Sequence, residues 1–276
     1  MGNVFRAMKK HEAEEPAEPQ APQAEPAKAK TAEAPPKLDM QQAMDRLRTG
    51  RPVQNGYSES LVAHHDRGGQ ITEEYRALRT NLLAQFRNER FCMLLTSAEA
   101  GEGKTVTCLN LAMILAERPD RRTIVVDCDL RRARVSSLLP IQKEPGLTEL
   151  LKGTVMLKDA TQGTAYPNLS IIAAGKARQE EVGELLGKAE LEEVIAQLRR
   201  QYDFVLLDTP PINVASDAGS VGRAAGDAIL VVRMNKTRRE SVDKAIRLLH
   251  AANVRPVGIV LTHQMYYIPN YLYRYS

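Results

Sequence analysis

The chain has 276 residues, of which 43% are hydrophobic and 26% are charged, the composition of a folded protein with one large domain or two small ones. Its net charge of +4 is too small to require nucleic acid as a partner, and we expect none. Its apolar runs fall far short of the ~20 residues that cross a bilayer, and its start lacks the apolar core of a secretory signal, so we expect a cytoplasmic protein.

The ends of the chain differ in composition from its middle. Residues 1–10 are expected to form a short basic amphipathic segment, followed at 11–56 by a disordered linker rich in Ala, Pro and Glu. Such a linker cannot bury enough apolar surface to offset the entropy lost on ordering. We therefore expect the folded domain at 57–264 and a flexible Tyr-rich tail at 265–276.

The middle of the chain alternates between two apolar patterns. Apolar residues from Ile71 to Phe86 recur at helical spacing and predict an amphipathic helix. Short apolar runs typical of strands follow at 91–96, 123–127, 169–173, 204–208, 228–232 and 257–261. Helical patterns separate them, for example at 191–198 and 242–249. Uninterrupted apolar strands alternating with helices indicate an α/β fold, doubly wound around a mainly parallel sheet.

A glycine-rich loop follows the first of these strands. Residues 98–105, Ala-Glu-Ala-Gly-Glu-Gly-Lys-Thr, fit the P-loop pattern except that Ala98 replaces the first glycine. Lys104 would reach the β- and γ-phosphates of ATP, and the Thr105 hydroxyl would bind Mg²⁺. A chance glycine-rich turn is the alternative, but the strand before the loop and the helix after it argue against one. The residues expected to surround the phosphates are Ala100, Gly101, Glu102, Gly103, Lys104, Thr105 and Val106.

Two other predicted strands end in carboxylates. The strand at 204–208 ends at Asp208, as in a Walker B motif, and the strand at 123–127 ends in Asp127-Cys128-Asp129. A single Asp at a strand end is more often a turn or cap residue, but two such strands beside a P-loop favour a metal site. We predict Thr105, Asp127, Asp129 and Asp208 as the metal shell, and Lys104, Asp127 and Asp129 as the catalytic residues.

These motifs resemble the bacterial tyrosine kinases of capsule and exopolysaccharide synthesis. The resemblance covers the chain from Thr72 onward. It includes Glu-Glu-Tyr-Arg-Ala-Leu-Arg at 73–79, similar to the family's E-x-x-R-x-x-R motif, Asp-Cys-Asp-Leu-Arg-Arg at 127–132, and Asp-Thr-Pro-Pro at 208–211. The catalytic domains of this family look like the partition and division-site ATPases, which are P-loop proteins of the deviant Walker type.

The resemblance implies an ATP-dependent protein-tyrosine kinase of the separate, cytoplasmic kind. In it, Asp127 would orient or deprotonate the attacking tyrosine hydroxyl. A ring-type homo-oligomer would form through Glu73, Arg76 and Arg79. A membrane-spanning polysaccharide chain-length regulator would activate the kinase and recruit it to the inner face of the plasma membrane, and a phosphotyrosine phosphatase would reverse its action. The autophosphorylation cluster would be Tyr266, Tyr267, Tyr271, Tyr273 and Tyr275.

Two other functions remain open from the sequence. One is a partition- or division-site-type ATPase, although Glu99 stands where those proteins carry a signature lysine. The other is a non-catalytic, ATP-gated regulator of polymer export, which the intact Lys104 and the three carboxylates disfavour. Related ATPases place an Asn after the last strand, where this chain has Thr262-His263, so the residues that contact the base are unassigned.

Overall fold

The computed structural model of the chain describes residues 53–54, 56–87 and 90–264. The expected segment 1–10 and the Tyr-rich tail 265–276 lie outside these residues, as does nearly all of the expected linker 11–56. The first described residues form β1 (Val53–Gln54), which pairs with β2 (Tyr57–Ser58) in an antiparallel hairpin.

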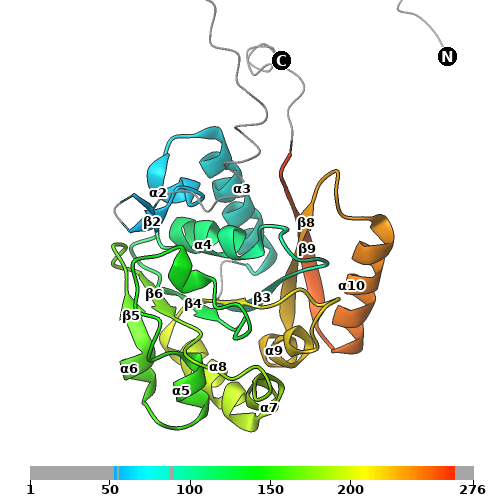
Figure 1. The fold of residues 1–276 in the computed structure, drawn as a ribbon. Coiled ribbons are helices and arrows are strands. Elements are labelled where there is room, and N and C mark those ends of the chain that lie inside the picture. Colours follow the sequence, from blue (N-terminus) through cyan, green and yellow to red (C-terminus); the bar gives the residue numbers. More distant parts are fainter. Residues whose placement is uncertain (1–52, 55, 88–89, 265–276) are drawn as a thin grey trace, which may run out of the picture. The chain divides into compact units, whose positions relative to one another are not determined.

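Seven strands form the central sheet in the order β5-β6-β4-β7-β3-β8-β9 (Figure 1). Their bounds are β3 (Phe91–Ser97), β4 (Thr123–Asp127), β5 (Thr161–Gly163), β6 (Leu169–Ile172), β7 (Phe204–Asp208), β8 (Asp227–Arg233) and β9 (Arg255–Thr262). All neighbouring pairs are parallel except β5 and β6. The six predicted strands are present within one or two residues of their expected ends. The sequence missed β5, whose three residues carry no apolar pattern.

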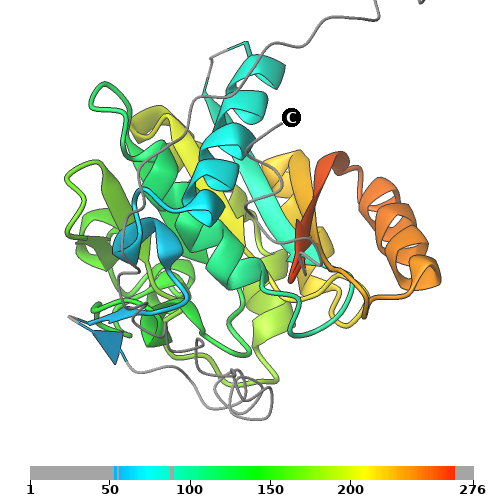
Figure 2. The same ribbon diagram turned by 90° about the horizontal axis from the view of Figure 1, so that it is seen from above.

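Helices lie on both faces of the sheet, as the views in Figures 1 and 2 show. Their bounds are α2 (Val62–His65), α3 (Gln70–Gln85), α4 (Lys104–Leu115), α5 (Leu147–Leu151), α6 (Leu157–Ala160), α7 (Val182–Gly187), α8 (Ala189–Gln201), α9 (Asp217–Ala225) and α10 (Arg239–Ala251), with a 3₁₀ turn at Val135–Ser137. None of the helices in the described part of the chain is long and apolar enough to cross a bilayer.

Alternate residues of β3 explain the two layers of core. Met93 packs in one buried cluster with Leu82 of α3 and Leu109 of α4. Leu94 points to the other face and packs in a second cluster with residues of α8, α9 and α10, such as Val221. Because successive side chains of a strand point to opposite faces, an all-apolar strand needs cover on both sides. The predicted doubly wound, mainly parallel α/β fold is confirmed.

The strand order also decides where the site forms. β7 lies between β4 and β3, and Asp208 at its end is in register with Asp127 of β4 and Leu95 of β3. The carboxyl ends of three adjacent parallel strands therefore meet at one edge, the usual position of ligand sites in such sheets.

Candidate active site

The loop after β3 has the backbone conformation that a phosphate cradle requires. Gly101 and Gly103 have positive φ angles of 79° and 90°, a region that L side chains enter only with strain. A Cβ atom on Gly103 would also lie 3.7 Å from Cγ2 of Thr262, so this side of the loop faces the end of β9. α4 begins directly at Lys104 and points its amino end at the loop, where backbone N–H groups attract phosphate.

Lys104 lies among the predicted carboxylates. Its Nζ atom is 3.1 Å from Oδ1 of Asp208 and 3.4 Å from Oδ2 of Asp129, and the Thr105 hydroxyl donates to Oδ2 of Asp208 at 2.7 Å. All four residues are buried. Burial lowers the pKa of Lys104, but the charges of Asp208 and Asp129 outweigh it and hold that pKa above its ordinary value. Four of the predicted site residues thus meet around a buried ammonium group.

Asp129 leaves one oxygen without a partner. Its side chain is buried, and Oδ1 accepts no hydrogen bond from the described residues. A buried carboxylate oxygen is costly unless a cation or a donor reaches it. Mg²⁺ prefers oxygen ligands and is usually held by one or two carboxylates together with substrate phosphates. No group of three or more acidic, His or Cys side chains in the described ranges forms a metal cage. Asp208, Asp129 and the Thr105 hydroxyl nevertheless fit Mg²⁺ that is bound together with a nucleotide.

Asp127 is close to this cluster but bonded differently. It is fully buried, its Oδ1 accepts the N–H of Asp129 at 3.1 Å, and its Oδ2 accepts the N–H of Val135 at 3.0 Å. Burial raises the pKa of the Asp127 carboxyl well above its ordinary value, and the charge of Asp208 adds to this. In the structure Asp127 therefore shapes the loop that carries Asp129, while Asp129 faces Lys104.

Glu102 ties the P-loop to two other parts of the fold, which the sequence did not predict. Its Oε2 accepts the N–H of Glu99 at 2.6 Å, and its Oε1 accepts the N–H of Arg233 at 3.2 Å and the Thr237 hydroxyl. The Thr262 hydroxyl donates to the backbone oxygen of Glu102 at 2.7 Å. This buried glutamate therefore joins the loop to the ends of β8 and β9. No local pattern reveals contacts between residues so distant in sequence.

The charged residues predicted for oligomerisation make bonds within the chain. On α3, Arg76 lies 2.6 Å from Oε1 of Glu117 and 2.5 Å from Oε1 of Glu73, and Arg79 lies 2.9 Å from Oε2 of Glu117. Because Glu117 follows the end of α4, these pairs hold α3 against α4. Their role between subunits stays a prediction, and the predicted autophosphorylation cluster lies outside the described residues.

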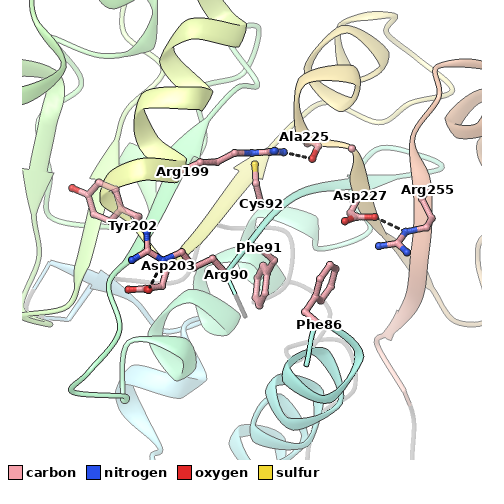
Figure 3. A pocket seen from close by; sticks show the side chains of 11 residues that line it. Phe86, Arg90, Phe91, Cys92, Arg199, Tyr202, Asp203, Ala225, Asp227 and Arg255 are labelled. Atoms are coloured by element: carbon pink, nitrogen blue, oxygen red, sulfur yellow. Dashed lines mark hydrogen bonds and ion pairs between the residues drawn. The ribbon is translucent and has the colours of Figure 1, made fainter. Parts of the chain in front are cut away.

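Two cavities lie at opposite ends of the strands. A cavity of about 190 Å³ is bordered by the P-loop, Asp129 and Arg132. A larger one of about 490 Å³ lies at the amino ends of β3, β8 and β9 (Figure 3). In the larger cavity, Arg90 pairs with Asp203 at 3.1 Å and Arg255 with Asp227 at 2.6 Å. Its arginines are bonded within the fold, whereas Lys104 lines the smaller cavity.

Comparison with known proteins links this site to a family. The family model described as "AAA domain" matches residues 93–240. Tyrosine-protein kinase YwqD of Bacillus subtilis is 30% identical over 191 residues, which are 69% of this chain and 80% of YwqD. Tyrosine-protein kinase Wzc of Salmonella typhimurium is 29% identical over 227 residues, which are 82% of this chain. The chain spans only 31% of Wzc, so the latter has a large part without a counterpart here.

Solved structures agree with these relatives. The kinase domain of the Escherichia coli tyrosine kinase Etk superposes with a TM-score of 0.71 and 28% identity, over 82% of this chain and 89% of that domain. The septum site-determining protein MinD of Pyrococcus horikoshii, complexed with Mg-ADP, gives a TM-score of 0.54 and 28% identity, over 66% of this chain and 75% of MinD. The chain belongs to the bacterial tyrosine-protein kinases, the family whose motifs its sequence carries.

Proposed function

We propose that this chain transfers the γ-phosphoryl group of ATP to tyrosine hydroxyls in the tails of neighbouring copies of itself. The observation that carries the proposal is the buried cluster of Lys104, Thr105, Asp129 and Asp208 at the mouth of the P-loop. The relatives with which the chain aligns over most of its length are named as tyrosine-protein kinases.

In this proposal each residue of the cluster has a separate task. The backbone N–H groups of residues 100–106 hold the phosphates. Thr105 and Asp208 would hold Mg²⁺, which would supply positive charge to the phosphate oxygens, and Asp129 lies beside them with one oxygen free. Lys104 adds a fixed positive charge at the γ-phosphate. Phosphoryl transfer depends mostly on such positioning and charge stabilisation, so no covalent enzyme intermediate is needed. The Mg-ADP bound by the structurally similar MinD supports the choice of nucleotide and metal.

The attacking tyrosine needs a group that accepts its proton. The phenol oxygen forms a bond to the γ-phosphorus, the bond between that phosphorus and the leaving ADP breaks, and the phenol proton passes to a carboxylate. The resemblance gave this role to Asp127, but both of its oxygens accept backbone N–H groups. Asp129 keeps one oxygen without a partner. We therefore assign to Asp129 the role of accepting the proton of the tyrosine hydroxyl. Asp127 then has the role of positioning Asp129.

The structure bears differently on the two alternatives. In a partition-type ATPase, the residue at position 99 would be a lysine that reaches a second copy. Here the Glu99 carboxylate accepts the Ser241 hydroxyl of α10 at 2.8 Å within the same chain, which disfavours that function. A regulator without catalysis would not need Lys104, Thr105 and two carboxylates brought together by burial. Both alternatives predict a protein without phosphotyrosine.

The cellular setting is also a proposal. We infer a homo-oligomer of the ring type that works with a membrane-spanning chain-length regulator, which recruits the kinase to the membrane and activates it. A phosphotyrosine phosphatase would return the tail to its starting state. The cycle would regulate the polymerisation and export of capsule or exopolysaccharide.

The test mixes two variants, one of which keeps the site without the acceptor tyrosines and the other the acceptor tyrosines without the site. A chain that lacks residues 265–276 keeps the site but has lost the proposed acceptor tyrosines, whereas Lys104→Met keeps the tail but has lost the site. Neither should gain phosphotyrosine alone with ATP and Mg²⁺, and their mixture should label only the Lys104→Met chain. Circular dichroism confirms that both are folded. An unlabelled mixture of folded chains, together with an unlabelled wild type, contradicts the proposed kinase.

A further inference from the structure

A groove lies between α3 and the carboxyl end of β9. It encloses about 300 Å³, and it lies at the outer strand of the sheet, next to the last described residues of the chain. Its walls come from α3 and from the end of β9 with the residues that follow it. They are Ile71, Glu74, Tyr75 and Leu78 on one side and Val260, Leu261, Thr262, His263 and Gln264 on the other.

Apolar side chains gather in and beside this groove without cover from the described residues. Among these residues, five large hydrophobic side chains are exposed, and three of them are here: Ile71 at 53%, Ile259 at 48% and Leu261 at 56%. Both Ile71 and Leu261 line the groove, and Ile259 is two residues from Leu261 along the same strand. Such a concentration of exposed apolar surface usually marks a binding site.

The strand itself also offers a free edge. β9 has eight residues and pairs with β8 on one side, and no described strand pairs with its other side. Edge strands with apolar side chains bind extended peptides through backbone hydrogen bonds and through pockets for alternate side chains.

We propose that the Tyr-rich tail of the same chain lies back along β9 and fills this groove. Gln264 lines the groove, and Met265, Tyr266, Tyr267 and Ile268 follow it directly and supply large apolar groups. His263 has a φ of 57°, the left-handed conformation that serves to reverse the chain direction in tight turns. An extended segment gains at most about 3.3–3.6 Å per residue, so residues 265–272 match the length of the eight-residue strand.

One feature of the tail sequence agrees with an edge position. Pro269 has no N–H group to donate, and proline in sheets is confined mainly to edge strands. A tail strand on β9 would be the new edge, and Pro269 on its outer side would close the sheet to further pairing.

The proposal rests on the proposed function for its consequence. A tail bound to its own groove withholds its tyrosines from the neighbouring subunit, so docking in cis opposes phosphorylation between subunits. Each phosphate adds about −1.5 to −2 charges, which an apolar groove disfavours. A phosphorylated tail therefore leaves the groove and does not return until a phosphatase acts on it.

The test uses chain that is free of ATP and treated with a tyrosine phosphatase, so that it does not depend on kinase activity. A photo-crosslinking benzoylphenylalanine replaces Leu261 in the full chain. We expect a cross-link to a peptide within 265–276, at monomer mass and with a yield that does not change on dilution. Met156 is equally exposed at 58% and lies near β5, so the same probe at Met156 should not reach the tail.

Hydrogen exchange gives a second measurement on unmodified side chains. Deleting residues 265–276 should speed exchange of β9 amides by about tenfold or more, since a paired edge is protected and a free one is not. Cross-links at dimer mass would identify a second copy as the occupant and overturn docking in cis. The absence of any tail cross-link at Leu261, with unchanged exchange in β9, would also overturn it. Neither outcome would bear on whether the chain is a kinase.

Discussion

The guanidinium group of Arg76 lies 2.6 Å from the carboxylate of Glu117 and so links α3 to the segment just after α4. The charged strip of α3, which consists of Glu73, Arg76 and Arg79, is therefore joined to the helix that follows the P-loop within one chain. Glu117 shares its second oxygen with Arg79 at 2.9 Å. The strip thus has an intrachain partner that any experiment on oligomerisation must take into account.

The first prediction separates the two roles of the strip. Arg76→Ala combined with Arg79→Ala should convert the proposed oligomer to a monomer, because we propose that the ring forms through these arginines. Glu117→Gln is the matched control, since it weakens the same intrachain bonds but keeps both arginines, and it should leave the oligomer intact. Light scattering measures the mass of each variant. If Glu117→Gln dissociates the oligomer equally, the arginines act by holding α3 to α4 rather than by contacting a neighbour.

The second prediction concerns the pH dependence of that link. The hydrogen bond from Arg76 lowers the pKa of Glu117 below its ordinary value of 4.5, and Arg79 contributes in the same direction. A carboxyl whose pKa is lower in the folded state stabilises the fold above its unfolded pKa, and this contribution is lost as the pH falls through the folded value. Because the pair is partly exposed, its size is at most about 1 kcal/mol. Urea unfolding should show wild type more stable than Glu117→Gln at pH 7, with the difference shrinking as the pH falls below 4.5. A difference that does not shrink as the pH falls contradicts the assignment.

The third prediction concerns Lys104. The Lys104→Met variant should lose phosphotyrosine formation by about 10²–10³-fold or more, because a charge aimed at the transferred phosphate is gone. Lys104 is buried beside Asp208 and Asp129, so the variant also leaves two buried carboxylates without their cation. We therefore expect a lower melting temperature without Mg²⁺ and partial recovery with it. Wild-type phosphotyrosine levels in this variant would remove Lys104 from the catalytic residues.

The fourth prediction concerns Glu102. In Glu102→Gln the amide NH₂ must face either the Glu99 N–H or the Arg233 N–H. Both groups are hydrogen-bond donors, so one of these two hydrogen bonds is lost. Losing hydrogen bonds to a charged group costs about 1.5–3 kcal/mol, so ATP affinity should fall roughly tenfold or more if the P-loop loses its shape. Glu99→Gln is the control, since among the described residues its carboxylate accepts the Ser241 hydroxyl alone. Equal ATP dissociation constants for Glu102→Gln and wild type, measured by titration, would show that the tether does not shape the site.

The sequence predicted those parts of the fold that depend on local pattern. β4 and β7 have the predicted ends because Thr123–Asp127 and Phe204–Asp208 are apolar runs that each stop at a charge. Asp208 at the end of β7 and Asp129, just after β4, meet at Lys104 because parallel strands place their carboxyl ends together. By contrast, β5 exists only because it pairs with β6, since Thr161–Gly163 has no strand pattern of its own. A local sequence pattern does not predict contacts between residues distant in sequence. For this reason the sequence did not predict that Glu117 pairs with Arg76 and Arg79, or that Asp127 accepts backbone N–H groups.

The bond from Thr262 to the backbone oxygen of Glu102 joins the P-loop to the end of β9, close to the start of the tail that we propose as the substrate. Only His263 and Gln264 separate Thr262 from this tail. If the tail is the substrate, as we propose, a change of the P-loop on binding phosphate would reach the start of the tail through this one bond. Nucleotide binding and the position of the proposed acceptor tyrosines would then be coupled without any further element between them.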